Sequence, residues 1–383
     1  MKLAIIGAVL LLAGVAGVAT GVLPVDAALE VADRVWPILL FVVAITIVAE
    51  LAAAAGVFDA AAARLARLAR GRVWVLWSLS VLLAIVVTAF LSLDTTAVLL
   101  TPVVVAVARA HRLPPLPFAF ATVWLANTAS LVLPVSNLTN LLAVHTLGSP
   151  TPGEFVLLLG PSALVAIVVT VVLLWLVHRR DLRGRFSPAP DPTVSDVVLL
   201  RCAAVVVVAV LPFFVSGVEP WIPAVAAMAV MVALFAWRSP SSLRPRLVPW
   251  QLVVFASGLF LAVGVLEALG SGAVLGVLAG TGDDLVALWQ VAGVGMLGAN
   301  AVNNLPAYLA LESVAGSPAR LAALLVGVNA GPLITPWASL ATLLWHARLH
   351  AVEVDVPWRR YVLLGLVVAP LTVALAVVPL ALH

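Results

Sequence analysis

Two polar runs that contain proline interrupt the apolar sequence of this chain, and the second run repeats the first. Residues 127–140 read NTASLVLPVSNLTN, and residues 329–342 read NAGPLITPWASLAT. At a constant offset of 202 residues, Asn127 matches Asn329 and Pro134 matches Pro336. Hydrophobic segments broken at matching places in two halves point to the binding site of a transporter. Exposed carbonyls, Asn amides and hydroxyls can hydrogen-bond a hydroxylated solute or coordinate a cation.

A second polar break precedes each run, SLDTT at 92–96 and NAVNNLP at 300–306. Non-helical backbone at membrane depth is tolerated only where it is buried in protein or lines a wet cavity. Half-helix N-termini at such breaks can also face partial negative charge. The alternative is that these polar residues join helices through interhelical hydrogen bonds. We expect the four breaks to converge on a substrate site formed by Ser92, Thr95, Thr96, Asn127, Thr128, Ser136, Asn137, Asn300, Asn303, Asn304, Asn329, Thr335 and Ser339.

Asp94 is the only acidic residue in the four breaks. An ionisable side chain at the membrane centre costs about 2.5–3.5 kcal/mol on insertion scales, so its default interpretation is functional. Because desolvation favours the neutral form of a carboxyl group, such a group can exchange protons near neutral pH. We predict that Asp94 couples transport to protons or to a cation, the alternative being a structural hydrogen-bonding role. Glu312 is a second-rank candidate, whereas Glu50 and Glu267 lie near expected span ends.

The residues absent from the breaks restrict the chemistry further. No Lys or Arg lies within them to balance a dicarboxylate, phosphate or sulfate, so a neutral hydroxylated solute or a small cation fits better. The sequence has no zinc-ligand spacing, no phosphate-binding loop and no Ser/His or paired-Asp arrangement. We therefore expect no enzyme activity, catalytic residue, bound metal or cofactor. The one cysteine, Cys202, permits no intrachain disulfide.

The composition places these breaks in a membrane protein. Of 383 residues, 64% are hydrophobic and 10% are charged, and the mean hydropathy is +1.22. A soluble domain could not cover so much apolar surface, so the sequence predicts an all-α polytopic protein in the lipid bilayer. The pI near 9.7 reflects basic residues in short loops. We interpret these as orientation signals and expect no nucleic-acid partner.

The charge distribution predicts a topology with about nine full spans. Placing the N-terminus in the cytoplasm and the C-terminus outside leaves only Arg34 and Arg320 of the loop arginines outside. This requires 73–110 and 285–317 to be re-entrant hairpins and 116–147 and 319–347 to cross once as broken helices. The remaining spans are expected at 3–22, 34–56, 155–177, 196–215, 221–237, 248–270 and 361–381.

The repeat extends upstream of the hairpins, because Trp36, Phe41 and Gly56 match Trp250, Phe255 and Gly270 at an offset of 214. The first copy starts outside and the second inside, which predicts an inverted repeat. We expect a first span and loop at 1–33, a first repeat at 34–177, a linker with connecting spans at 178–247, and a second repeat at 248–383. Within the linker region, 178–195 is charged and proline-rich.

Four runs resemble the arsenite and antimonite permeases of bacterial arsenic resistance. They are SLDTTAVLLTPVVVA at 92–106, ANTASLVLPVSNLTNLL at 126–142, ANAVNNLPA at 299–307 and GVNAGPLITPWASLATLLWH at 327–346. That family belongs to the ion transporter superfamily, with dicarboxylate and sodium–proton antiporter families as more distant relatives. The resemblance implies export of arsenite or antimonite as the neutral hydroxide in exchange for protons, by alternating access, across the bacterial inner membrane. It also implies a cytoplasmic ATPase subunit as a partner of some members, and homodimers among the wider relatives.

The chain departs from the family pattern at three positions. The family often has Asp where this chain has Asn127 and Asn329, and Lys where it has Leu333. All three residues are uncharged here, which leaves Asp94 as the sole central titratable group. Two alternatives therefore stay open. One is a sodium-coupled or sodium–proton transporter of the same fold, and the other is a passive channel or facilitator.

Overall fold

The computed structural model describes residues 2–187 and 196–382. Most of these residues are helical, and the one β-type pairing among them is an isolated antiparallel bridge between Arg72 and Arg185. Eight of the described helices are long and apolar enough to cross a membrane. The prediction of an all-α polytopic membrane protein is therefore confirmed. Of the expected linker 178–195, residues 188–195 lie outside the described residues.

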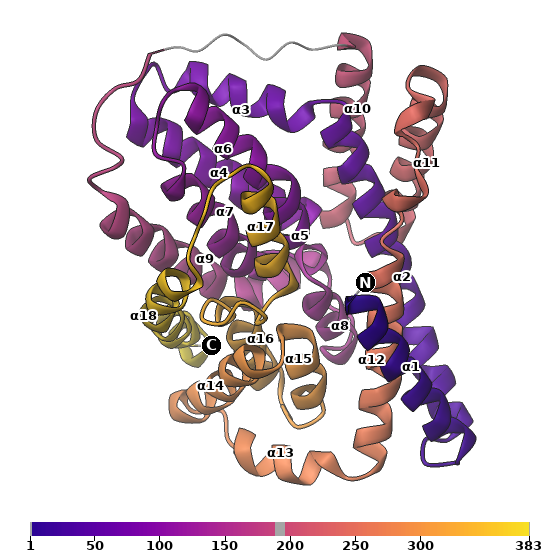
Figure 1. Ribbon diagram of the computed structural model, residues 1–383. Coiled ribbons are helices and arrows are strands. Elements are labelled where there is room, and N and C mark those ends of the chain that lie inside the picture. The colour runs from indigo at the N-terminus through magenta and orange to yellow at the C-terminus, as the bar shows by residue number, and fades with distance from the viewer. Residues whose placement is uncertain (1, 188–195, 383) are drawn as a thin grey trace.

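The described residues of the first half of the chain form nine α-helices, and Figure 1 shows their arrangement. A single wide turn over Thr96–Leu100 joins α5 to α6, so that Leu93–Ala110 is one helical run. Helix α2 starts nine residues before the expected span at 34, directly after Pro24. The helices are α1 Lys2–Ala19, α2 Val25–Ala54, α3 Val57–Leu68, α4 Val73–Leu91, α5 Leu93–Thr95, α6 Thr101–Ala110, α7 Leu116–Thr128, α8 Leu138–Thr146 and α9 Pro152–His178.

Residues 196–382 form nine more α-helices. The expected spans at 196–215, 221–237, 248–270 and 361–381 each coincide closely with a helix or helical run. These helices are α10 Val197–Val210, α11 Trp221–Arg238, α12 Trp250–Ala268, α13 Ser271–Ala279, α14 Leu285–Ala301, α15 Asn304–Glu312, α16 Pro318–Ala330, α17 Leu340–Ala351 and α18 Trp358–Val377.

Both segments expected to be hairpins turn back on themselves. In the first, the Val73 amide donates to the carbonyl of Gly184, and the His111 ring lies 4.5 Å from the Phe186 ring. The two ends of 73–110 therefore meet the same short segment. In the second, Ser317 donates a hydrogen bond to Asp283, so the ends of 285–317 also lie together. The helices that precede these segments, α3 and α13, lie at opposite ends of the molecule (Figure 1).

The two turns have the same unusual backbone. Ser92 has φ 113° and ψ 160°, and Asn303 has φ 140° and ψ 159°. This region is essentially restricted to glycine, and occupying it costs an L-residue about 1–3 kcal/mol. Upstream, Gly56 and Gly270 precede α3 and α13 with φ near 82° and 88°. The two glycines matched by sequence at an offset of 214 thus share a left-handed conformation that suits glycine.

The protein has two hydrophobic cores, and the second half of each broken helix packs in the core of the other half of the chain. The core formed mainly by α2, α4, α6 and α7 also buries Trp345 and Leu349 of α17. The core formed mainly by α14, α15 and α16 buries Leu142 and Ala143 of α8. Each broken helix therefore begins in the core of its own half and ends in the other. The polar loops 129–137 and 331–339 consequently lie where the two cores meet.

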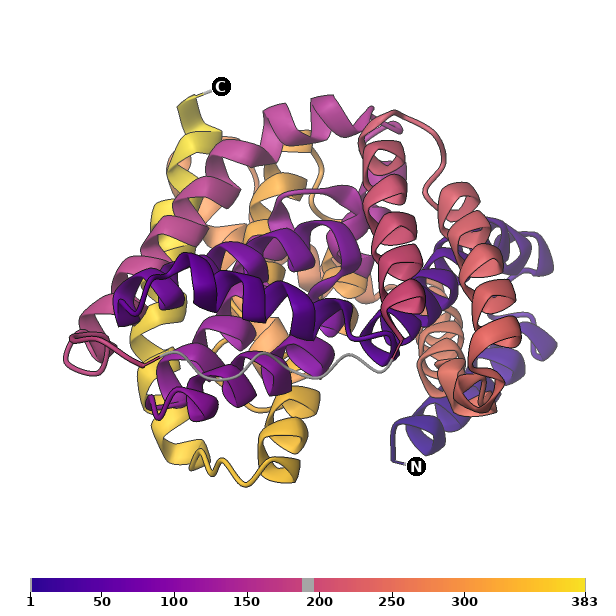
Figure 2. The same cartoon turned by 90° about the horizontal axis from the view of Figure 1, so that it is seen from above.

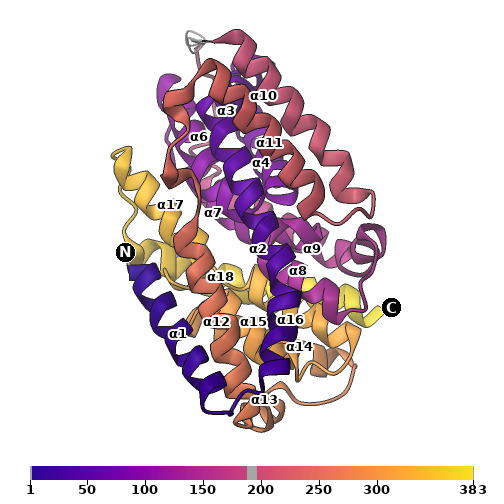
Figure 3. The ribbon, with the colours of Figure 1, turned by 90° about the vertical axis from the view of Figure 1, so that its right-hand side faces the viewer.

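The remaining helices flank these cores. Seen from above, α10 and α11 stand beside α2 (Figure 2), and α1 runs along α12 (Figure 3). Small residues allow α1 and α12 to approach closely. A Cβ atom added at Gly258 would lie 2.4 Å from the carbonyl oxygen of Gly7.

Candidate functional site

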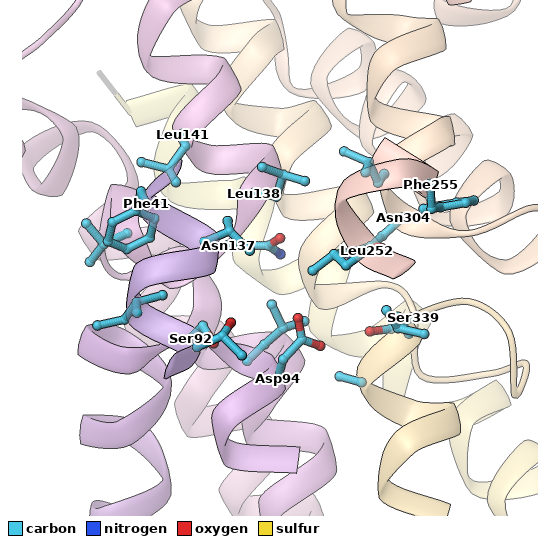
Figure 4. Close-up of a pocket in the computed structure, with 18 of the residues that line it drawn as sticks. Phe41, Ser92, Asp94, Asn137, Leu138, Leu141, Leu252, Phe255, Asn304 and Ser339 are labelled. Carbon is cyan, nitrogen blue, oxygen red and sulfur yellow. The ribbon is translucent and has the colours of Figure 1, made fainter. Parts of the chain in front are cut away.

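Four helix N-termini surround one small cavity in the interior of the molecule (Figure 4). The N-cap residues are Ser92 of the run 93–110, Asn137 of α8, Asn303 of α15 and Ser339 of α17, and all four line the cavity. Its volume is about 70 Å³. Cavities for drug-sized ligands measure about 300–1,000 Å³, so this one suits a solute of a few non-hydrogen atoms. All four polar breaks thus contribute to one cavity.

Matched residues of the two halves form its apolar walls. Phe41 of α2 faces the cavity together with Phe255 of α12, and Leu138 of α8 together with Leu340 of α17. The sequence match paired Phe41 with Phe255, and at the offset of 202 Leu138 also matches Leu340, but none of these residues was assigned to the site. Sequence reasoning also missed Thr46, which lies on an uninterrupted apolar helix. The one feature of the sequence that could have indicated a cavity-lining role for Thr46 is its isolated position as a polar residue among apolar ones in this helix.

Asp94 points into the cavity together with Asn137 and Ser339 (Figure 4). It is half-buried, and its carboxylate makes no hydrogen bond or ion pair with any described residue. Asp94 also lines a second cavity of about 330 Å³, together with Thr95, Arg246 and Arg348. Asp94 therefore lies at the boundary between a small interior cavity and a wider space that contains basic side chains.

The Ser339 hydroxyl has no hydrogen-bond partner among the described residues, although Ser339 is fully buried. The side chains of Ser92, Asn137 and Asn303 each accept a hydrogen bond from an amide in the first turn of the helix they precede. The Ser339 side chain makes no such bond. Because an unpaired buried hydroxyl costs about 1–3 kcal/mol, Ser339 is suited to bind a group that enters the cavity.

Asn329 joins the two broken helices rather than lining the cavity. Its Oδ1 accepts hydrogen bonds from Asn137 Nδ2 at 2.9 Å and from Thr139 Oγ1 at 2.8 Å. Its Nδ2 donates to Asn140 Oδ1 at 2.7 Å. Through these bonds the Asn329 side-chain amide holds the start of α8 in place, and it has few donor or acceptor positions left with which to bind cargo.

Asn300 positions the loop that carries Ser339. Its Nδ2 donates to the Gly331 carbonyl, and its Oδ1 accepts from the amides of Ile334 and Thr335 at 3.1 and 3.0 Å. The Asn300 carbonyl accepts from the Thr335 hydroxyl and from the indole of Trp337. Asn300 and Thr335 are thus brought together, but neither lines the cavity.

Most of the other predicted site residues make side-chain hydrogen bonds within the protein. The Thr96 hydroxyl pairs with that of Thr88, Thr128 donates to the carbonyl of Trp124, and Ser136 donates to that of Ala89. Asn127 donates to the Val123 carbonyl, while its buried Oδ1 has no partner among the described residues. Asn304 lines the cavity with no side-chain hydrogen bond within the described part of the chain.

A third cavity lies beyond Phe41 and Leu141, which line both it and the central cavity. Its volume is about 310 Å³, and Arg34, His145 and Glu219 are among its polar lining residues. The central cavity thus lies between two wider ones. It meets one at Asp94 and is separated from the other by the side chains of Phe41 and Leu141.

The chemistry of the central cavity is that of binding. The partial positive charges of helix N-termini favour electron-rich oxygens. Asp94 is the only ionisable residue among the lining residues. Within residues 2–187 and 196–382, no three His, Cys, Asp or Glu side chains are placed to hold a metal ion. The cavity therefore suits a small oxygen-bearing solute, with one carboxylate that could carry a proton or pair with a cation.

Comparison with known proteins agrees with a transport function. A family model described as citrate transporter matches residues 2–344. The chain is 32% identical over 366 residues to an arsenical pump membrane protein of Escherichia coli, covering 87% of this chain and 83% of that protein. It is 31% identical over 382 residues to an arsenical pump membrane protein of Yersinia enterocolitica, with coverages of 91% and 86%.

Proposed function

The chain belongs to the citrate transporter family and is related to the arsenical pump membrane proteins, and on this premise we propose that it exports arsenite or antimonite as the neutral hydroxide in exchange for protons. It is a multi-pass membrane protein, and its relatives are transporters rather than enzymes. The observation that carries the proposal is the convergence of four helix N-termini on a cavity of about 70 Å³ with one carboxylate.

The size and polarity of the cavity support a small, neutral, hydroxylated cargo. A volume of about 70 Å³ leaves little room for a tricarboxylate, and no Lys or Arg lines the wall to balance its charge. The Ser339 hydroxyl and the Asn304 amide are free to bond the hydroxyls of the cargo. Helix N-termini favour its electron-rich oxygens.

The position of Asp94 supports its role in coupling. It faces both the central cavity and the cavity that contains Arg246 and Arg348, so a proton can reach it from that side without crossing the cargo site. A carboxyl group without a fixed partner can change its charge without breaking a structural bond. In this mechanism protonation of Asp94 alternates with cargo binding.

Three pairs of features support an inverted repeat with two re-entrant hairpins. The residues at the two turns, Ser92 and Asn303, have nearly the same φ and ψ. The helices α3 and α13 each follow a left-handed glycine and lie at opposite ends of the molecule. The exchange of α8 and α17 between the two cores is also reciprocal. In this proposal the hairpins and broken helices move as one unit to give alternating access.

The distribution of arginine supports an orientation with the N-terminus in the cytoplasm and the C-terminus outside, in a bacterial inner membrane. The ends of the first hairpin and the segment 184–187 that they contact are rich in arginine, including Arg72, Arg109, Arg112 and Arg185. The cavity beside Asp94 contains Arg246 and Arg348 and would then face the cytoplasm.

Arsenite efflux tests this function directly. The chain is expressed in a host without its own arsenite permease, and intracellular arsenic is measured while pH and sodium are varied independently. We expect resistance to arsenite and lower accumulation, with a dependence on the proton gradient and none on sodium. Unchanged accumulation would refute arsenite export. Dependence on sodium would favour the sodium-coupled alternative, and flux that continues without any gradient dependence would favour a channel.

A further inference from the structure

Two short helices connect the central cavity to a polar cluster on the opposite side from Asp94. Helices α8 and α15 contain nine residues each, begin at the cavity-lining N-caps Asn137 and Asn303, and contact one another. At 1.5 Å per residue each is about 13 Å long. Their C-terminal ends carry partial negative charge. The ends of the two helices therefore need a cation nearby, especially since α15 ends at the acidic Glu312.

Arg34 of α2 supplies that cation to both helices. Its Nη2 donates to the carbonyl of Leu142 at 3.0 Å and to the hydroxyl of Thr146 at 3.2 Å, both in α8. The same nitrogen forms an ion pair with Oε1 of Glu312 in α15. Tyr308 and Thr146 also donate to that oxygen, so the Glu312 carboxylate is buried and well bonded.

The same face of α2 carries the side chain that closes the central cavity. Phe41 follows Arg34 by seven residues, which is about two helical turns, so the two side chains lie on one face. Phe41 is 2% exposed and packs edge-on against Phe214, with ring centroids 5.7 Å apart. With Leu141 of α8 it separates the central cavity from the cavity of about 310 Å³ that Arg34 lines. A connection between these cavities requires Phe41 and Leu141 to separate, as they would if α8 moved away from α2.

We propose that Arg34 and Glu312 are positioning residues that hold this side of the transport site closed by joining the far ends of α8 and α15 to α2. Opening toward the Arg34 side breaks the bonds from Arg34 to Leu142 and Thr146 and displaces Leu141 from Phe41. This inference rests on the proposed function only in requiring that the cavity open to both sides. It assigns a second acidic residue, Glu312, to the closing contact rather than to coupling.

The test measures how fast a single cysteine at the closed boundary reacts. Leu141→Cys is introduced together with Cys202→Ser. A membrane-impermeant maleimide is then added to sealed vesicles in which the Arg34 side of the protein faces the external solution. Glu312→Gln, which keeps the shape of the side chain, and Arg34→Ala are each combined with this reporter. We expect labelling to accelerate about tenfold, which corresponds to ~1.4 kcal/mol lost from the closed state. The charge exchange Arg34→Glu with Glu312→Arg is expected to label as fast as Arg34→Ala, because a carboxylate at position 34 cannot donate to the Leu142 carbonyl.

Arg238→Ala is the matched control, because Arg238 pairs with Asp196 between α10 and α11 and lines none of the three cavities described above. It is expected to label at the parent rate. Vesicles are compared only for variants that elute as the parent does in size-exclusion chromatography. Should Arg34→Ala fail this criterion, the test rests on Glu312→Gln alone. Parent-like labelling in Glu312→Gln would overturn the proposal. The assay contains no arsenite, so a failure of arsenite export leaves its result interpretable.

Discussion

The side chains of Asn137 and Asn329, which are 192 residues apart in the sequence, form a hydrogen bond of 2.9 Å at the centre of the molecule. Asn137 is the N-cap of α8, and Asn329 lies near the end of α16. The bond therefore connects the second half of one broken helix to the first half of the other. Because Thr139 and Asn140 also bond Asn329, the relative position of the two loops depends on one amide.

Replacing Asn329 with Ala should lower stability. The change leaves Asn137, Thr139 and Asn140 without their buried partner, which costs about 1–3 kcal/mol. Thermal unfolding in detergent, followed by size-exclusion chromatography, would measure the loss. Asn304→Ala is the control, since its side chain faces the cavity and makes no hydrogen bond with described residues. We expect Asn304→Ala to unfold like the parent and to transport more slowly, and equal stability of the two variants would contradict the assignment.

Ser339→Ala should separate binding from stability. It removes a buried hydroxyl that has no partner among the described residues, so the protein should unfold at the parent temperature or slightly above. Loss of one hydrogen bond to cargo is worth about 1 kcal/mol, which would raise KM for arsenite roughly fivefold. Initial rates of uptake into inverted vesicles give KM. A less stable variant with parent KM would mean that Ser339 is structural.

Asp94→Asn should abolish proton-driven transport while the protein remains folded. The amide has nearly the same shape but cannot carry a titrating proton, and Asp94 makes no bond with described residues that the change would break. Arsenite uptake into inverted vesicles is measured with and without an imposed pH gradient. We expect the gradient-dependent component to fall to background. If it persists at the parent rate, Asp94 is not the coupling site.

Gly327→Ala should disrupt the packing of α16 on α14. A Cβ atom at Gly327 would lie 2.2 Å from the backbone oxygen of Ala292, a contact that requires the helices to separate. Such overpacking costs about 1–3 kcal/mol. On α14, Gly293→Ala would meet no atom within 4 Å and should gain up to ~1 kcal/mol from helix propensity. Expression level and thermal midpoint would order the two variants, and similar values would contradict this packing.

Asp196→Asn should weaken the start of α10 in a manner that depends on pH. The hydrogen bond from Arg238 and the amide of Leu199 lower the pKa of Asp196 below its ordinary value of 3.8. A lowered pKa contributes stability above the ordinary pKa, and this contribution disappears as pH falls through the folded value. The parent should therefore be more stable than the variant at pH 7, and the difference should vanish well below pH 3.8. A constant difference across this range would exclude the ionic contribution.

The helical membrane fold could be predicted from the sequence because it depends on local properties. The length of each apolar segment predicted the membrane spans, and proline and polar residues within such segments indicated the breaks. The match between Gly56 and Gly270 identified two positions that share one backbone conformation. The placement of the breaks around a common cavity was also anticipated, although their assignment to an inverted repeat stays a prediction.

The individual roles of the polar residues could not be predicted, because a sequence does not show which partner an amide will find. Asn304 and Asn329 are the same residue type in two related breaks, yet the first faces the cavity and the second is fully bonded. The apolar boundary was missed for a different reason. Phe41 lies on a continuous hydrophobic helix, where a cavity-facing side chain resembles one that faces lipid.

The arrangement of the four N-caps also affects how the protein is made. Ser92 and Asn137 lie in the first half of this sequence, whereas Ser339 follows Asn137 by about two hundred residues, so the cavity has all its walls only after α17 has been made. A truncated chain that ends before α17 lacks the last wall and cannot enclose cargo.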